Sequence, residues 1–290
     1  MRKIFPILAL FLVILLLFLG TKGIPKNKFS IELIGHRSNL EEMVAKSLEN
    51  SAGTYAMAIK NLKSGEEYYQ EADRIFPAGS LYKLGTMLAT LEQIEEGEIR
   101  EDEVISGDVS QINRILGISD EEAEVKQDRI DFTIENALRQ MIAISHNYAA
   151  VLLTEKVGVN KAQEAVNRLG LVNTKIDTTD KPETTARDML TFFEKVYKRE
   201  GVSVYTSSRI ISLLLQQELN DRIPKYLPKE AKVAHKTGEI DFAKHDAGIV
   251  FANSGDYLIV VLSESDNPSA ASERIANLSK AVYEYFSKKN

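Results

Sequence analysis

The sequence predicts an α/β (α+β) protein in which helices flank an antiparallel sheet and an all-helical lobe is inserted into the chain. Three observations support this prediction. Short β-favouring runs occur at 55–70, helical periodicity fills the middle from 80 to about 218, and strand-like runs return after Pro228. Strands at both ends with helices between them imply one sheet assembled from distant parts of the chain.

Each element follows from a local pattern. Apolar residues at helical spacing predict a helix over 39–48, and Lys63-Ser64-Gly65 indicates a turn between strands at 55–62 and 67–70. In the middle we expect helices at 80–97, 132–144, 147–157, 161–169, 186–198 and 207–219, with a variable connection at 106–129. The C-terminal part adds strands at 232–240, 246–252 and 257–263 and a helix at 269–287.

Composition narrows the classes of function. A chain of 290 residues with 44% hydrophobic content can build a large core, and we expect one domain with two lobes. The net charge of −6 comes without a basic patch, so we expect no nucleic-acid partner. The chain has no cysteine and therefore no thiolate nucleophile or Cys-based metal site. We expect no metal, no cofactor and a monomer.

The N-terminus predicts an exported protein. Arg2 and Lys3 precede an apolar run, Ile4 to Leu19, which is long for a signal peptide and short for a spanning helix. No small-x-small cleavage site follows in 21–24, so we favour an uncleaved signal-anchor over a cleaved signal peptide. The positive residues would keep the N-terminus inside and place the rest on the outer face of the cytoplasmic membrane, or release it as a secreted protein. We therefore assign 1–24 to this segment and 25–37 to a tether.

The central motif is the stretch 76–84, where a loop leads into a helix. Ser80 and Lys83 are one helical turn apart, so the hydroxyl and the amine are neighbours. An amine can take the serine proton if burial or a nearby cation lowers its pKa. Alone, the pattern is more typical of a helix-capping serine followed by a solvated lysine.

Two further motifs favour the catalytic interpretation. Ser145-His146-Asn147 follows an apolar helical run, and Lys236-Thr237-Gly238 lies in a predicted strand. The ordered trio Ser-x-x-Lys, Ser-x-Asn and Lys-Thr-Gly resembles the signature of class A β-lactamases and penicillin-binding proteins, and the resemblance covers most of the chain after residue 38. It implies a β-lactamase/transpeptidase-like domain at 38–290, with an α/β lobe at 38–79 and 220–290 and a helical lobe at 80–219.

The resemblance also implies a role for each site residue. Ser80 would attack an amide or lactam carbonyl, Lys83 would remove its proton and Ser145 would relay a proton to the departing nitrogen. Asn147 would hold a substrate amide. The Lys236-Thr237-Gly238 segment would bind the substrate carboxylate. The backbone N–H groups of Ser80 and Glu239 would form the oxyanion hole.

The sequence departs from the family pattern in two places. His146 replaces the Asp that is usual in the middle motif, and we interpret it as a structural substitution. The loop that carries the deacylating Glu in class A enzymes is mostly deleted between Ile176 and Thr185. Glu183, Asp180 or Asp177 could replace that Glu, and all three are equally well explained as turn residues near Pro182.

Two classes of function therefore remain open. The first is an exported active-site-serine hydrolase that acts on β-lactams or D-Ala-type peptides of peptidoglycan through an acyl-serine. The second is a penicillin-binding, D,D-peptidase-like, wall-binding or sensing protein that acylates without efficient deacylation. Fold alone does not separate them.

Overall fold

The computed structural model describes residues 39–119, 121–178 and 182–288. The predicted N-terminal segment, 1–24, and the tether, 25–37, lie outside these residues. Among the residues described, no helix combines the length and the apolar character that crossing a bilayer requires. The division into two lobes stays a prediction.

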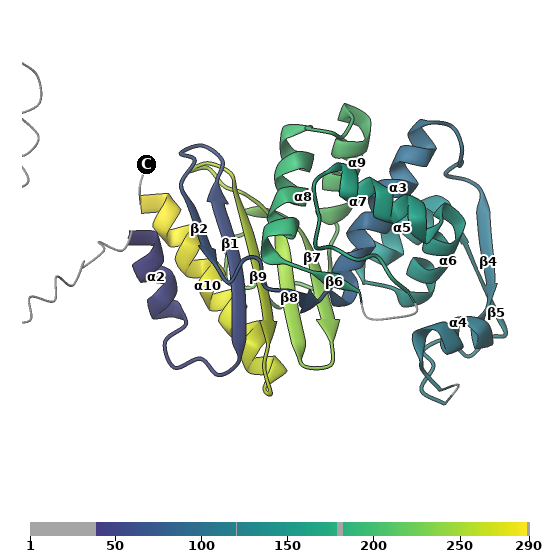
Figure 1. Ribbon diagram of the computed structural model, residues 1–290, viewed down its shortest axis with the longest axis horizontal. Coiled ribbons are helices and arrows are strands. Elements are labelled where there is room, and N and C mark those ends of the chain that lie inside the picture. Colours follow the sequence, from purple (N-terminus) through teal and green to yellow (C-terminus); the bar gives the residue numbers. More distant parts are fainter. Residues whose placement is uncertain (1–38, 120, 179–181, 289–290) are drawn as a thin grey trace, which may run out of the picture. The chain divides into compact units, whose positions relative to one another are not determined.

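The predicted antiparallel sheet is confirmed. It has five strands in the order β2-β1-β9-β8-β7, so the N-terminal hairpin lies beside the last strand of the chain (Figure 1). β1 and β9 pair along their whole lengths, from Thr54 opposite Glu264 to Asn61 opposite Tyr257. The strands are β1 Thr54–Asn61, β2 Glu67–Gln70, β7 Lys232–Ile240, β8 Ala243–Phe251 and β9 Tyr257–Glu264.

Both faces of this sheet are buried. Side chains alternate along β1: Met57 and Ile59 belong to an apolar cluster shared with α2 and α10, whereas Ala56 and Ala58 belong to the cluster that includes α8. Helices therefore cover the sheet on both sides (Figure 1). These helices are α2 Asn39–Ser47, α8 Ala186–Lys198 and α10 Pro268–Lys288.

The helical middle of the chain is built around α3. This helix is buried over most of its length and contacts α6, α7 and α9. A short 3₁₀ helix, η1, precedes it, so Ser80 lies in a 3₁₀ turn and Lys83 is the first α-helical residue. The elements are η1 Gly79–Tyr82, α3 Lys83–Glu95, α5 Ile134–Ala143, α6 Asn147–Val157, α7 Val159–Arg168 and α9 Val204–Leu214.

Two predicted regions differ from the structure. The variable connection at 106–129 contains a helix, α4 Val109–Leu116, flanked by a strand pair, β4 Val104–Asp108 with β5 Arg129–Thr133. The helix expected at 207–219 ends at Leu214, because the next residues bond to the last carbonyls of α5 instead. The Gln217 side chain donates to Ile142 O and the Glu218 N–H donates to Ala143 O.

Candidate functional site

Ser80 is positioned by a close contact between η1 and β7. Gly79 has φ +48°, and a Cβ added there would lie 2.7–2.9 Å from the Glu239 backbone. No residue with a side chain could adopt that conformation in that space. The backbones of Gly79 and Glu239 are therefore in contact, and Ser80 and Glu239 line the same cavity.

Lys83 is fully buried and its amine is directed to the middle motif. Its Nζ lies 2.6 Å from Ser145 O, 3.2 Å from Ser145 Oγ and 2.8 Å from Asn147 Oδ1. Burial is the main cause that holds the pKa of Lys83 well below its usual value, and the charge of Lys236 lowers it further. Both causes were expected from the sequence, and burial is the larger one.

Lys236 approaches the same hydroxyl from the sheet. Its buried Nζ lies 3.0 Å from Ser145 Oγ and 2.8 Å from Thr237 O. Burial lowers the pKa of Lys236 to about 7, although Asp246 acts in the opposite direction and Arg222 adds to the lowering. The Ser145 hydroxyl is thus placed between two lysine amines from elements far apart in sequence.

The middle motif is held by the first turn of α6. Ser145 has φ +59°, in the left-handed region, and Asn147 is the first residue of the helix. The His146 ring accepts a hydrogen bond from the Ala149 N–H at 3.2 Å and packs edge-on against Phe132. His146 therefore caps the helix, which is the structural role expected of it.

A cavity of about 360 Å³ opens over Ser80. Asn147 and Glu239 line it, while Lys83, Ser145 and Lys236 are not among its lining residues. Thr237 and Gly238 are buried on β7 beside it. The remaining lining residues are Gly79, Tyr82, Ile115, Leu116, Gly117, Ile118, Asp177, Thr178, Pro182 and Ile240.

Of the three carboxylates proposed to replace the missing Glu, one lines the Ser80 cavity and one is not among its lining residues. Asp177 lines the cavity, and its side chain, 19% exposed, lies 3.2 Å from Lys175 Nζ. Glu183 is exposed on β6 Glu183–Thr184, whose backbone pairs with β3 Phe76–Pro77, and it is not one of the lining residues described. Asp180 lies outside the described residues.

The Glu239 side chain has a partner that the sequence did not reveal. Its carboxylate pairs with Arg222 and with Lys244. Arg222 is 1% exposed and also donates to His245 O at 3.1 Å, so it binds both β7 and β8. No motif surrounds Arg222 in the sequence, because its role depends on the pairing of those two strands.

The two strand histidines have separate partners. On β7, His235 Nδ1 is 2.9 Å from Asp246 Oδ1 and Nε2 is 3.1 Å from Asn220 Oδ1. On β8, His245 contacts the backbones of Pro77 and Ser263. Within the described ranges, no three His, Asp or Glu residues gather as metal ligands.

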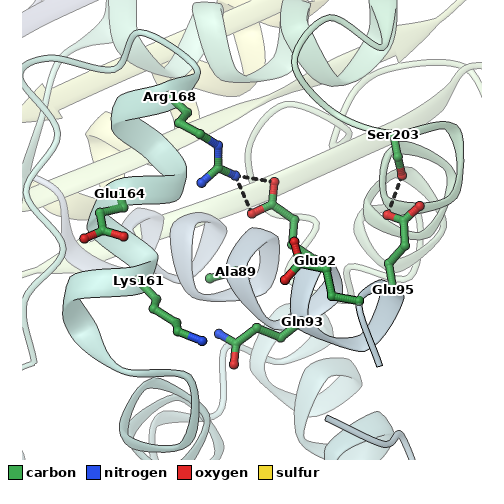
Figure 2. A pocket seen from close by; sticks show the side chains of 9 residues that line it. Ala89, Glu92, Gln93, Glu95, Lys161, Glu164, Arg168 and Ser203 are labelled. Atoms are coloured by element: carbon green, nitrogen blue, oxygen red, sulfur yellow. Dashed lines mark hydrogen bonds and ion pairs between the residues drawn. The ribbon is translucent and has the colours of Figure 1, made fainter. Parts of the chain in front are cut away.

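A second cavity, of about 410 Å³, lies at the C-terminal end of α3 (Figure 2). Several of its polar groups are bonded to one another. Arg168 donates to both oxygens of Glu92 at 2.7 and 2.6 Å, and Ser203 donates to Glu95 at 2.5 Å. Ser203 Oγ also accepts from the Thr206 N–H as the cap of α9, so this hydroxyl has a structural role and we place the candidate site at Ser80 instead.

Comparison with known proteins identifies the family and the fold of this chain. A family described as the beta-lactamase enzyme family matches residues 39–286. No curated protein sequence matches the chain. The β-lactamase of Sphaerobacter thermophilus is 20% identical, with 87% of this chain and 98% of that chain covered and a TM-score of 0.76.

Two further solved structures are similar. A mutant of PBP-A, solved as an acyl-enzyme complex with penicillin G, is 24% identical, with 86% of this chain and 96% of that chain covered and a TM-score of 0.76. A representative class A β-lactamase from Bacteroides cellulosilyticus is 22% identical, with 87% and 98% covered and a TM-score of 0.75. These similarities confirm the predicted fold.

Proposed function

Because the chain belongs to the beta-lactamase enzyme family over residues 39–286, we propose that it is an exported active-site-serine hydrolase. Its substrates would be β-lactams or D-Ala-type peptides of peptidoglycan, attacked through an acyl-serine intermediate. The predicted N-terminal segment, 1–24, would place the domain on the outer face of the cytoplasmic membrane. The PBP-A mutant that forms an acyl-enzyme with penicillin G supports a β-lactam as ligand.

The observation that carries this proposal is the Ser145 hydroxyl between two buried lysine amines. A lysine acts as a base only when it is uncharged, and burial beside a second cation favours that form. Two N–H groups of neutral Lys83 can donate to Ser145 O and Asn147 Oδ1. This leaves its lone pair to accept a proton.

Acylation then needs one proton to pass from the nucleophile to the leaving group. Ser80 Oγ bonds to the carbonyl carbon while its proton moves to Lys83 Nζ. As the C–N bond breaks, Ser145 gives its hydroxyl proton to the departing nitrogen and regains one from Lys83. The product is an ester at Ser80 and a neutral amine.

The neighbouring groups would bind the substrate. Backbone N–H groups of Ser80 and Glu239 would stabilise the oxyanion. Lys236 and Thr237 would receive the substrate carboxylate, and the amide of Asn147 would hold a substrate amide. Gly238 would complete this binding segment, and its missing side chain lets β7 lie close to Ala78 O and the His245 ring.

Deacylation divides the two classes of function. A carboxylate must activate the water that attacks the ester, and Asp177 is better placed than Glu183 because it lines the Ser80 cavity. If Asp177 does not serve, the acyl-serine persists and the protein acts as a penicillin-binding, D,D-peptidase-like or sensing protein. The shortened loop after Ile176 is the observation that favours this second candidate.

Labelling tests the acylation step. We expect the full chain to form a covalent adduct with a fluorescent penicillin, and Ser80→Ala to abolish it because the attacking oxygen is lost. Asp73→Ala, at an exposed ion pair with Arg187, is the matched control and should label as the wild type does. Absence of an adduct in folded wild-type protein would refute the proposed acyl transfer at Ser80.

Turnover tests the deacylation step. We expect nitrocefin hydrolysis to fall about 100-fold or more in Asp177→Asn, with labelling preserved, since general-base catalysis contributes about that much. Glu183→Gln should hydrolyse nitrocefin at the wild-type rate. The reverse ranking would move the role to Glu183, and stable labelling without turnover in the wild type would establish the second class of function. Release of D-alanine from a D-Ala-D-Ala peptide would then identify a peptidase.

A further inference from the structure

His245 is a buried histidine whose protonation state follows from its partners. The Ser263 N–H donates to Nδ1 at 3.1 Å, and Nε2 lies 2.7 Å from Pro77 O. A backbone N–H can only donate and a carbonyl can only accept, so Nδ1 carries no proton and Nε2–H is the donor to Pro77. The ring is neutral, in agreement with burial lowering the pKa of His245 to about 4.

The carbonyl that His245 holds is three residues before Ser80. Proline has no amide hydrogen, so residue 77 can form backbone hydrogen bonds only through its carbonyl. The Ala78 N–H donates to Pro182 O at 2.7 Å, which fixes the other side of this segment. The His245 contact therefore decides where the chain lies as it enters the turn that carries Ser80.

The same ring also supports β7. A Cβ added at Gly238 would lie 3.2 Å from His245 Cδ2, so the ring packs closely against the backbone that leads to Glu239. Phe76 meets the ring edge-on, with centroids 6.0 Å apart. One rigid imidazole thus contacts both segments that supply the oxyanion-hole N–H groups.

We propose that His245 is a positioning residue for acylation: its Nε2–H holds Pro77 O, and its ring holds Gly238, at the separation at which the Ser80 and Glu239 N–H groups bind the oxyanion. This inference rests on the proposed acyl transfer at Ser80. It predicts an effect on the acylation rate and little effect on the affinity for the ligand, because the oxyanion forms only as the carbonyl is attacked.

Two substitutions separate positioning from packing. In His245→Asn the amide oxygen can replace Nδ1 and accept from Ser263, but the side chain is too short to reach Pro77. In His245→Gln the terminal N–H₂ reaches the place of Nε2 and can donate to Pro77. With benzylpenicillin, we expect His245→Asn to lower the acylation rate constant about 100-fold, as for a misplacement of about 1 Å, and His245→Gln to restore most of it.

Stability controls complete the test. Val282→Ala, in the apolar cluster on the opposite face of the sheet, lowers stability without touching this contact and should acylate as the wild type does. The inference is overturned if His245→Asn is acylated as fast as the wild type. It is also overturned if His245→Asn and His245→Gln are equally stable and their acylation rate constants fall by the same factor. A wild type that is never acylated would instead remove the proposed function itself.

If neither variant folds, a measurement on the wild-type protein tests the inference instead. The buried Nε2–H of His245 should give a slowly exchanging proton resonance in NMR spectra. We expect that resonance to shift when penicillin acylates Ser80, because an acyl carbonyl bound by the Ser80 and Glu239 N–H groups changes the electric field at the Pro77–His245 hydrogen bond. A resonance that is unchanged on acylation would overturn the inference.

Discussion

Ser145 has a backbone φ of +59°, a conformation that residues with a Cβ rarely adopt. The left-handed region costs such a residue about 1–2 kcal/mol. Lys83 donates to the Ser145 carbonyl at 2.6 Å, and both lysine amines contact its hydroxyl. The contacts that orient the proposed proton relay thus also hold its backbone in a strained state, as is common at functional sites.

This strain can be measured by comparing two substitutions of Ser145. Both Ser145→Gly and Ser145→Ala remove the hydroxyl, and both should lower acylation about 100-fold or more. Only glycine also relieves the strain, so we expect Ser145→Gly to be more stable than Ser145→Ala by about 1 kcal/mol in urea unfolding. Equal stability of the two variants would show that the backbone at residue 145 is not strained.

At the scale of elements, the site depends on the contact of η1 with β7. Gly79 brings the two backbones so close that an added Cβ would lie 2.7 Å from Glu239 O. Backbone atoms cannot move aside as a flexible side chain can. The separation of these elements is therefore set by the absence of one methyl group.

We expect Gly79→Ala to lower the acylation rate about 100-fold, because β7 must move away from Ser80. Gly65→Ala is the matched control. Gly65 also has a positive φ, +75°, but nothing lies within 4 Å of an added Cβ. Both variants acquire left-handed strain, and only Gly79→Ala acquires the clash. Penicillin acylation kinetics on both proteins measure the difference, and an equal loss in the two would refute the steric explanation.

At the scale of the whole molecule, a buried ionic network joins the loop before β7 to the sheet. Asp246 Oδ2 accepts from the Ile223 N–H at 3.0 Å, and Asp246 Oδ1 faces His235. The Asn220 amide N–H₂ donates to Gln217 O, which leaves its oxygen toward His235 Nε2. Both ring nitrogens of His235 therefore face oxygen atoms, so the ring links Asp246 on β8 to Asn220 in the loop before β7.

Removing Asp246 should weaken the fold as a whole. Asp246→Ala leaves His235 Nδ1 and the Ile223 N–H buried without a partner, and we expect it to lower the free energy of unfolding by about 3 kcal/mol or more. Asp73→Ala, at an exposed pair, should change it little. Urea unfolding of both variants measures this contrast. A loss at Asp246 no larger than at Asp73 would show that the network does not hold the loop.

Much of the fold could be predicted because helix and strand patterns are local. The ranges 186–198 and 232–240 match α8 and β7 at both ends, and the hairpin turn was predicted from three residues. The prediction was wrong where distant groups compete for the backbone. α9 ends early because the C-terminal end of α5 offers acceptors to Gln217 and Glu218. The helix α4 and its strand pair were missed because short elements have weak periodicity.

By itself, the sequence determined the kinds of residue at the candidate site and the elements that carry them, because Ser-x-x-Lys, Ser-x-Asn and Lys-Thr-Gly are each read within a few neighbouring positions. Only the tertiary structure decided the burial of the two lysine amines, their meeting at Ser145 and the position of Asp177 in the cavity. Lys83 and Lys236 lie 62 and 91 positions from Ser145. Burial and pKa depend on such distant contacts, and no local pattern encodes them.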